Sequence, residues 1–451
     1  MGLTLNNISN LKAPRIVSEL PGPKVRELMK FAGPLFPKYI QPVMEKAEGI
    51  FVEDPDGNIF IDFISERCVA NIGHSHPEFV RALQNQIALG TTGITRNILR
   101  MMMKLNQVTP GKQEKMILCG LSGSAMNDMA IKLSRKLTGR QNIVSFAGSY
   151  HGTTYGALSL SSYKQSMFKG FGPLVPGIHK MPYPSCYRCM FKSEYPKCEL
   201  ACLDYLEEYA FNSYIAPEEV AAIIFEPIQG DAGWHIPPDE WVNRLKEICE
   251  KHGILLVAEE VQTGFGRTGK WFAVDHWNLV PDILLLGKSI GGGVPYSAAV
   301  VKSSLFDGEG KNADGLGHTL SYNPLSVVAT CTNIEIIEKQ NLVENSAKLG
   351  EYALNRLKET QEDSSIMGDV RGKGLLIGVE IVKDKKSKHP SIGLADKIVE
   401  ECFKKGLYLI HMGAFNTSVL RIAPPLVINE AQMDSSLDIL EKSIRQAERS
   451  G

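Results

Sequence analysis

Lys288 stands out among the residues that could do chemistry. It follows four apolar residues and Gly287, and three glycines come soon after it, at 291–293. Apolar runs of this kind are typical of buried parallel strands, and lysine is seldom fully buried unless another group pairs with it. An ordinary lysine at a strand end would point into water. A desolvated lysine would be a nucleophile able to form a Schiff base with a carbonyl compound.

Polar residues also follow several other apolar runs. In open α/β sheets, ligands bind beyond the carboxyl ends of the strands. Because five sets occupy such positions in one chain, we expect them to share one pocket. The sets are Ser122-Gly123-Ser124, Tyr150-His151-Gly152, Glu226, Glu259 and Lys288.

These sets suit one kind of ligand. The small residues 122–124 would open a helix whose N-terminus favours a phosphate, although a plain serine N-cap is the simpler interpretation. Tyr150 could lie against a flat heteroaromatic ring or be a core tyrosine. Glu259 and Glu260 end a buried strand, and a desolvated carboxylate needs a partner. That partner could be a protonated pyridine nitrogen of a ligand or an arginine of the protein.

The elements that must position these residues alternate between strand and helix. Apolar runs separated by helical stretches such as 238–253 predict βαβ units and a doubly wound, mainly parallel α/β sheet. The predicted strands are 115–120, 142–148, 221–228, 254–260, 282–288 and 297–301.

The two ends of the chain have a different pattern. The N-terminal part holds two short strands at 49–54 and 58–63, joined by the turn DPDGN, whose residue types favour a tight turn. The C-terminal part has long amphipathic helices and short strands. We predict an N-terminal segment (1–74) that contributes to a small α+β domain, a large ligand-binding domain (75–330) and the rest of the small domain (331–451).

Composition narrows the class of protein. The chain has 451 residues, is 43% hydrophobic and has a formal net charge of -1, so it can bury a large core. No basic face argues for a nucleic acid or an anionic membrane as partner. No signal-peptide core and no apolar run of about 18 residues is present. We expect a cytoplasmic enzyme that acts on small molecules.

Four of the nine cysteines cluster in one segment, CYRCMFKSEYPKCELAC. The C-x2-C and C-x3-C pairs resemble the ligand pairs of a zinc site, but only eight residues separate them, which is shorter than usual. No metal is expected in catalysis, because no histidine or carboxylate joins the cluster. A structural metal or a redox staple is the alternative, and it would be held by Cys186, Cys189, Cys198 and Cys202.

Two motifs together resemble a known family. EEVQTGFGRTG, followed some twenty residues later by LGKSIGGG, resembles the class III, fold-type I, pyridoxal-phosphate enzymes, most of which are ω-aminotransferases. The likeness runs from about residue 15 to the C-terminus. It implies the cofactor pyridoxal 5'-phosphate (PLP), with an internal aldimine on Lys288, whose amine later moves the substrate α-proton.

The same resemblance implies roles for the other candidates. Gly123 and Ser124 would hold the phosphate, Tyr150 would stack on the ring and Gln262 would bond the ring hydroxyl. Thr319 resembles a threonine that reaches the phosphate of the neighbouring subunit, which implies a homodimer or a dimer of dimers. The full predicted cofactor-binding set is Ser122, Gly123, Ser124, Tyr150, His151, Glu226, Glu259, Gln262, Lys288 and Thr319.

On the substrate side, Arg421 matches the family arginine that grips a carboxylate, a role suited to guanidinium geometry. Glu226 resembles the acid that can neutralise this arginine. Asp231 stands where typical ω-aminotransferases have glutamate. Together with the motifs at 14–17, 21–24 and 366–382, Asp231 resembles the amino-acid racemase and epimerase branch, in which it would be a second acid/base facing Lys288. Its simpler interpretation is a loop cap.

Three positions depart from the family pattern. Glu259 replaces the usual aspartate against the pyridine nitrogen, and Ala125 replaces an acidic residue. Glu66-Arg67 replaces small residues near the substrate entrance. This pair could change the preferred substrate charge, or the two side chains could bridge each other.

Two reactions therefore remain open. The first is transfer of an amino group from a 4-aminobutyrate-like or other amino donor to a 2-oxo acid. The alternative is amino-acid racemisation or epimerisation by Lys288 and Asp231. A dimeric scaffold with a degenerate site is a third, non-enzymatic interpretation.

Overall fold

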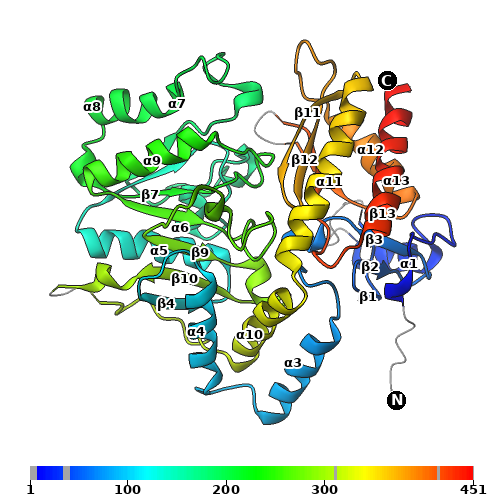
Figure 1. Ribbon diagram of the computed structural model, residues 1–451, viewed down its shortest axis with the longest axis horizontal. Coiled ribbons are helices and arrows are strands. Elements are labelled where there is room, and N and C mark those ends of the chain that lie inside the picture. The colour runs from blue at the N-terminus through cyan, green and yellow to red at the C-terminus, as the bar shows by residue number, and fades with distance from the viewer. Residues whose placement is uncertain (1–7, 34–40, 309–311, 414–416, 450–451) are drawn as a thin grey trace.

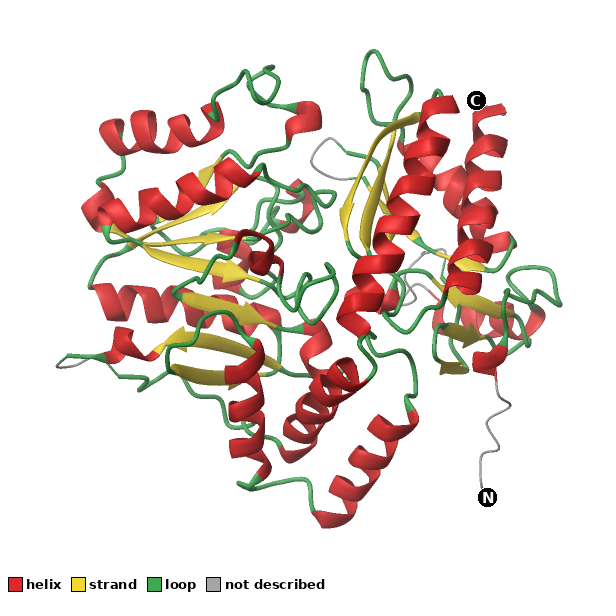
Figure 2. Cartoon of the chain, viewed as in Figure 1, coloured by secondary structure: helices red, strands yellow, loops and turns green. Residues whose placement is uncertain are grey.

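The protein forms a large and a small body, seen side by side in Figure 1. The computed structural model describes residues 8–33, 41–308, 312–413 and 417–449. The large body contains a sheet with helices on both faces, and the small body contains both ends of the described chain (Figures 1 and 2).

The large sheet has seven strands in the order β4-β10-β9-β8-β7-β5-β6. β10 runs antiparallel to its neighbours β9 and β4, whereas the other pairs are parallel. The α/β, mainly parallel sheet expected from the sequence is confirmed. Its strands are β4 (Lys115–Gly120), β5 (Asn142–Phe146), β6 (Ile178–Met181), β7 (Val220–Phe225), β8 (Leu255–Glu259), β9 (Ile283–Leu286) and β10 (Ser297–Lys302).

Continuous apolar runs form these strands because both faces of the sheet are covered. In β9, Leu284 and Leu286 belong to the same hydrophobic core as Trp241 of helix α9 (Asp239–His252). The alternate residues Ile283 and Leu285 pack in the other core, with the residues of α5 (Gly123–Thr138). A strand with only one buried face would have alternated polar and apolar residues.

The small body joins the two ends of the chain. β13 (Leu407–Tyr408) pairs in parallel with β3 (Ile59–Asp62), which continues to β2 (Phe51–Glu53) and β1 (Lys46–Glu48). A second sheet has the order β11-β12-β15-β14. Its strands are β11 (Met367–Lys373), β12 (Leu376–Ile381), β14 (Ile410–Met412) and β15 (Val419–Ile422). The predicted sharing of one small unit by both ends agrees with this pairing, while the boundaries at 74 and 330 stay predictions.

Helices complete both bodies. The long helical stretch after residue 323 forms two helices. Asn341, which lies between them, has a left-handed conformation (φ 51) that a continuous helix does not allow. Besides α5 and α9, the helices are α1 (Pro23–Ala32), α2 (Ser65–Cys68), α3 (Pro77–Leu89), α4 (Asn97–Val108), α6 (Tyr155–Leu160), α7 (Ala201–Asp204), α8 (Phe211–Ser213), α10 (Pro324–Lys339), α11 (Leu342–Asp363), α12 (Ile392–Lys404) and α13 (Glu430–Arg449).

Three strands were not predicted, and the first of them is the three-residue edge strand β1, with the sequence KAE. β6 has the sequence IHKM and β11 the sequence MGDVRGK. Neither β6 nor β11 has a continuous apolar run. β6 lies at one edge of the large sheet and β11 at one edge of the small sheet. Pairing with a neighbouring strand, rather than their own apolar pattern, makes them strands.

The ion pair between His74 and Asp62 should make the stability of the protein depend on pH. His74 Nε2 lies 2.8 Å from Oδ2 of the fully buried Asp62. Burial lowers the pKa of His74, but the hydrogen bond and charge of Asp62 outweigh burial and raise the pKa above 6.5. A raised pKa in the folded state contributes stability that is fully present below the unfolded pKa and is lost as pH rises through the folded pKa.

His74→Gln should therefore lower the melting temperature more at pH 6 than at pH 9. A hydrogen bond to a charged partner contributes about 1.5–3 kcal/mol, so the gap at pH 6 should be several degrees. Melting curves of both proteins from pH 5 to 9 measure this difference. An equal gap at every pH would contradict a stabilising histidinium.

Candidate active site

A cavity of about 160 Å³ lies at the carboxyl ends of the large sheet's strands. β4, β5, β7 and β9 each end just before a predicted site residue, and β8 ends on Glu259. The shared pocket expected from the sequence is thus present. Its lining is Gly123, Ser124, Tyr150, His151, Gly152, Glu226, Ile228, Asp231, Glu259, Val261, Gln262, Thr263 and Lys288.

The N-terminus of α5 forms one wall of the cavity. The first N–H groups of a helix have no intrahelical partner and favour an anion, and Gly123 and Ser124 stand there. Ser124 Oγ accepts the Thr153 N–H at 3.2 Å. Ser122 does not line the cavity: its hydroxyl accepts the Ala125 N–H at 3.2 Å, the capping role.

Two buried polar atoms in this cavity have no hydrogen-bond partner among the described residues. They are Glu226 Oε2 and His151 Nε2. Glu226 Oε1 accepts the Gly230 N–H at 3.1 Å. Burial, helped by the charge of Glu259, raises the pKa of Glu226 well above its ordinary value. Buried polar atoms are nearly always paired, so these two mark places for ligand atoms.

Glu259 is held in a defined orientation. Its Oε1 accepts the Val261 N–H at 2.8 Å, and its Oε2 lies 3.1 Å from His151 Nδ1. The partner that a buried carboxylate requires is therefore a histidine and a backbone N–H, rather than the arginine considered from the sequence. The role of His151 as an anchor for Glu259 was not visible in the sequence, where the two residues are far apart.

Asp231 and Arg421 form an ion pair at the cavity. Arg421 is 2% exposed, and its Nη2 donates to Asp231 Oδ1 and to the Gly230 carbonyl, both at 2.9 Å. Burial raises the pKa of Asp231, but Arg421, Lys288 and Gln262 outweigh burial, so the pKa is lowered. Asp231 is thus a carboxylate at neutral pH.

This pairing differs from the expectation for Glu226. The family resemblance implied that Glu226 is the acid that can neutralise Arg421. In the structure, the acid in contact with Arg421 is Asp231. The carboxyl of Glu226 turns instead to the Gly230 N–H. The turn that starts at Gly230 brings residue 231 to the arginine, and sequence order alone does not reveal this.

Lys288 begins a short 3-10 turn at the end of β9. It is half-buried and left-handed (φ 43), and it lines the cavity together with Asp231. The preceding Gly287 allows close packing, because a Cβ there would lie 3.0 Å from Val261. Glycine at 287 thus lets the chain before Lys288 pack closely against Val261.

Aromatic residues extend the site. Tyr150 lines the cavity, and its ring meets that of Tyr163 edge-to-face at 6.1 Å. Trp234 Nε1 donates to Gln262 Oε1 at 2.8 Å, and the Arg421 guanidinium lies 5.0 Å from the centre of the Trp234 ring. Sequence reasoning missed Tyr163 and Trp234. The only signal for Trp234 was its position directly after QGDAG.

The Glu66-Arg67 departure lies in a strained turn. All four residues of Ser65–Cys68 are left-handed, with φ of 44, 49, 62 and 66. A left-handed conformation disfavours each such residue by about 1–2 kcal/mol. Ser65 Oγ accepts from Arg267 Nη2 at 3.0 Å and Glu66 N–H donates to Asp62 at 3.1 Å, which holds the turn. Both Glu66 and Arg67 are exposed.

Arg67 belongs to the cavity's electrostatic surroundings. Burial, then Asp231, raises the pKa of Tyr150, and Arg67 opposes this rise. Burial and Asp231 likewise raise the pKa of Tyr163 to about 12, again against Arg67. Arg67 is therefore close enough to Tyr150 and Tyr163 to affect both hydroxyl groups.

The four clustered cysteines line a second, much smaller cavity of about 20 Å³. None of them forms a disulfide. Burial raises the pKa of Cys186 to about 11 and that of Cys202 to about 12. No group of three or more His, Cys, Asp or Glu side chains in the described chain is arranged to hold a metal ion. The metal alternative for Cys186, Cys189, Cys198 and Cys202 therefore gains no support.

Thr319 lies apart from the cavity, exposed in the segment before α10. Its predicted contact with a neighbouring subunit stays a prediction. Within residues 8–33, 41–308, 312–413 and 417–449, no helix has the length and apolar character needed to cross a membrane.

Comparison with known proteins adds to this geometry. The family model described as "Aminotransferase class-III" matches residues 37–444. The alanine/serine racemase of Pyrococcus horikoshii is 39% identical over 96% of this chain and 93% of its own. A probable 4-aminobutyrate aminotransferase of Bacillus subtilis is 34% identical over 89% and 92%. The structure of an amine transaminase from an uncultivated Pseudomonas species, in its PLP-bound form, is similar with a TM-score of 0.83 and 27% identity over 92% and 98%.

The residues present fit PLP, the cofactor of this family. The α5 N-terminus suits a phosphate, and the unpaired atoms of His151 and Glu226 lie in the same cavity. Lys288 supplies the amine and Glu259 the carboxylate that an aldehyde and a pyridine nitrogen require. This chain belongs to the class III aminotransferase family of PLP-dependent enzymes.

Proposed function

We propose that this protein is an amino-acid racemase or epimerase that uses Lys288 and Asp231 as its two acid/base groups. The observation that carries the proposal is Asp231, a carboxylate with a lowered pKa in the same cavity as the Lys288 amine. The printed names of the relatives support it, because the alanine/serine racemase is 39% identical and the aminotransferase 34%. The sequence alone had put aminotransfer first.

The residues would act at the substrate Cα and at the substrate carboxylate. When bound, PLP withdraws electrons from the substrate Cα–H bond and makes that proton acidic. The Lys288 amine takes or returns a proton at Cα on one face, and Asp231 does the same on the other. Arg421 binds the substrate carboxylate by charge-assisted hydrogen bonds. For this, Asp231 must release part of its contact with Arg421.

Gly123 and Ser124 would hold the cofactor phosphate, and Glu259, fixed by His151, would face the pyridine nitrogen. Tyr150 would lie against the ring, and Gln262 would bond its hydroxyl. The proposal also includes a cytoplasmic homodimer in which Thr319 reaches the phosphate of the neighbouring site.

A change at Gly152 tests the phosphate wall. Gly152 has φ +131, and a Cβ there would lie 2.1 Å from Ser124 Oγ and 2.9 Å from Ser124 Cα. Gly152→Ala should therefore displace Ser124 and weaken PLP binding at least about tenfold, which corresponds to about 1.4 kcal/mol. Titration of the apo-protein with PLP, followed by absorbance, measures the Kd.

Gly170→Ala is the matched control. Gly170 also has a positive φ (+89), but a Cβ there meets nothing within 4 Å. It should keep the wild-type Kd. An unchanged Kd in Gly152→Ala would argue against a phosphate site at this wall.

Aminotransfer is the second candidate, and it includes a 4-aminobutyrate-like donor with a 2-oxo acid acceptor. The Arg421–Asp231 pair favours it, because an arginine that can be neutralised could accept substrates with and without a carboxylate at that position. Reprotonation away from Cα, followed by hydrolysis, would yield an oxo acid instead of the other enantiomer.

One experiment separates the two reactions. The holoenzyme is incubated with single L-amino acids, with and without 2-oxoglutarate, and both chirality and oxo-acid products are followed. Formation of D-amino acid without any oxo acid is expected. Oxo-acid formation that depends on 2-oxoglutarate, with no D-amino acid from any substrate, would overturn the proposal in favour of aminotransfer.

A further inference from the structure

The turn that carries Asp231 is held from the small body as well as from its own, larger body. The Gly230 carbonyl accepts from Arg421 Nη2 at 2.9 Å, and the Ala232 carbonyl accepts from Thr417 Oγ1 at 3.1 Å. The Gly233 carbonyl accepts from two nitrogens of Arg371, Nε at 2.9 Å and Nη2 at 2.6 Å. Three of the carbonyls that surround Asp231 are therefore fixed by β11, β15 and the residues just before β15.

These contacts follow from the register of the small sheet. Arg371 lies opposite Gly378, and Gly378 lies opposite Arg421, so the three form one row across β11, β12 and β15. Opposite residues share a face of the sheet. A Cβ on Gly378 would lie 3.5 Å from the Gly233 carbonyl oxygen, so the turn rests on the glycine between the two arginines.

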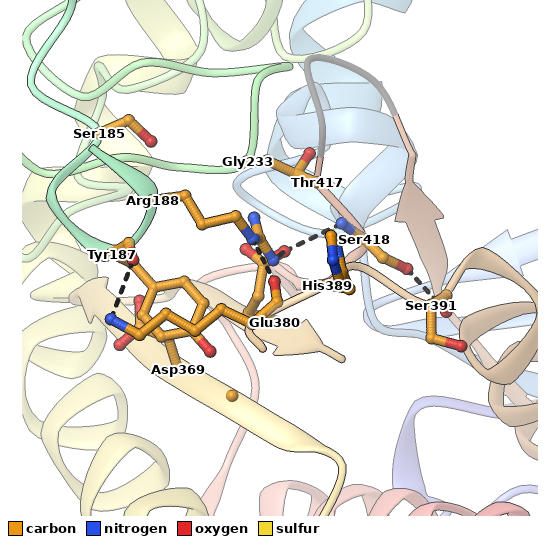
Figure 3. A network of polar contacts seen from close by, with 12 residues as sticks. Ser185, Tyr187, Arg188, Gly233, Asp369, Glu380, His389, Ser391, Thr417 and Ser418 are labelled. Carbon is orange, nitrogen blue, oxygen red and sulfur yellow. Dashed lines mark hydrogen bonds and ion pairs between the residues drawn. The ribbon is translucent and has the colours of Figure 1, made fainter. Parts of the chain in front are cut away.

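Arg371 is itself fixed by a network of charged side chains, of which Arg188, Asp369 and Glu380 are labelled in Figure 3. Its Nη1 donates to Asp369 at 2.7 Å and its Nη2 to Glu380 Oε2 at 2.9 Å. Glu380, with no exposed side-chain surface, also accepts from Arg188 Nη2 at 2.5 Å and from the Ser418 N–H at 3.0 Å. The charges of two arginines and two carboxylates cancel in this network. Because the guanidinium of Arg371 also donates hydrogen bonds to Asp369, Glu380 and the Gly233 carbonyl, it has little freedom to move.

We propose that Arg371, oriented by Glu380, is a positioning residue that sets the place of Asp231 in the active site. Arg371 acts through the Gly233 carbonyl, two residues from Asp231, and has no role in proton transfer itself. Because acid/base catalysis needs the group within hydrogen-bond reach of its proton, a shift of about 1 Å is enough to reduce the rate about a hundredfold. Lys288 lies in the other body, in the 3-10 turn that follows β9 of the large sheet.

The first test measures the turn directly. In Arg371→Gln, the peptide that spans residues 229–235 should exchange its amide hydrogens faster than in the wild-type holoenzyme, because its Gly233 and Trp234 N–H bonds to Gly230 lose their support. Hydrogen exchange is read by mass spectrometry. Unchanged exchange in this peptide would overturn the proposal.

Arg356→Gln is the matched control. Arg356 also binds several carboxylates in the small body, on α13, but no residue of this turn. It should leave exchange of the 229–235 peptide at the wild-type rate. Equal acceleration in both variants would show general destabilisation, and the positioning role would be rejected.

A second readout rests on the proposed racemase function. In D2O, Arg371→Gln should lower inversion of configuration at least about tenfold relative to α-deuterium exchange on the Lys288 face. Equal loss of both would contradict a role through Asp231. If the wild type inverts no amino acid, the racemase proposal fails, while the hydrogen-exchange result still decides the positioning role.

Arg371→Lys addresses the case in which the glutamine variant does not fold. Lysine keeps the charge near Glu380 but lacks the fork that binds Gly233 through two nitrogens. It should fold, recover part of the inversion and show intermediate exchange in the 229–235 peptide. Wild-type exchange and inversion in Arg371→Lys would mean that charge alone is needed, and would overturn the geometric role.

Discussion

Lys288→Ala is expected to lower turnover by at least about 10⁴-fold while the protein still folds. In the proposed mechanism the Lys288 amine would both hold the cofactor aldehyde and move the α-proton, and loss of a positioned acid/base group alone reduces rates about 10²–10⁴-fold. Steady-state kcat with an amino acid substrate measures the loss, and the melting temperature and circular dichroism report folding.

Lys302→Ala is the control for this variant. Lys302 ends β10 and pairs with Asp282 at 2.8 Å, outside the cavity, so its loss should leave kcat within about twofold of wild type. Borohydride treatment of the holoenzyme should also leave the cofactor attached to Lys288 Nζ, as found by peptide mass mapping. Wild-type turnover in Lys288→Ala, or label on another lysine, would remove the basis of the proposed function.

Asp231→Asn should separate the two faces of the substrate. Asparagine has nearly the same shape but cannot act as a base, so racemisation should fall about 10²–10⁴-fold. Exchange of the α-proton with solvent deuterium should persist for the enantiomer that is served by Lys288. Chiral chromatography measures inversion, and proton NMR in D2O measures exchange.

The same variant should also change substrate binding. Arg421 loses a charged partner at 2.9 Å, so the substrate carboxylate competes with a weaker contact and KM should fall. Asp396→Asn, which changes an exposed aspartate paired with His411, serves as the control with unchanged kinetics. Racemisation at the wild-type rate in Asp231→Asn would eliminate this residue as the second acid/base group.

Much of the fold could be predicted because its strands carry their pattern locally. All six predicted strands of the large sheet are present, since runs such as Ile283–Leu286 are apolar enough to be covered on both faces. β6 and β11 were missed because edge strands need less apolar surface. The C-terminal helices were predicted without bounds, so the break at Asn341 was not placed, although asparagine adopts the left-handed conformation more readily than most residues.

The site was predicted at the level of its members. Nine predicted residues line one cavity because parallel strands bring their carboxyl ends to the same edge. Their pairing was not predictable. The contacts His151–Glu259 and Arg421–Asp231 join residues 108 and 190 positions apart, and such pairs form only when sheets and turns pack.

The sequence by itself determined the family and, with it, the cofactor PLP, because the motifs that identify the family are short stretches with a fixed spacing along the chain. Only the tertiary structure showed which acid contacts Arg421, which buried polar atoms of the cavity have no hydrogen-bond partner in the described chain, and which residues hold the turn of Asp231. Those properties depend on the distances between side chains from different strands and on their burial. The row formed by Arg371, Gly378 and Arg421 exists only because β11, β12 and β15 pair in one register.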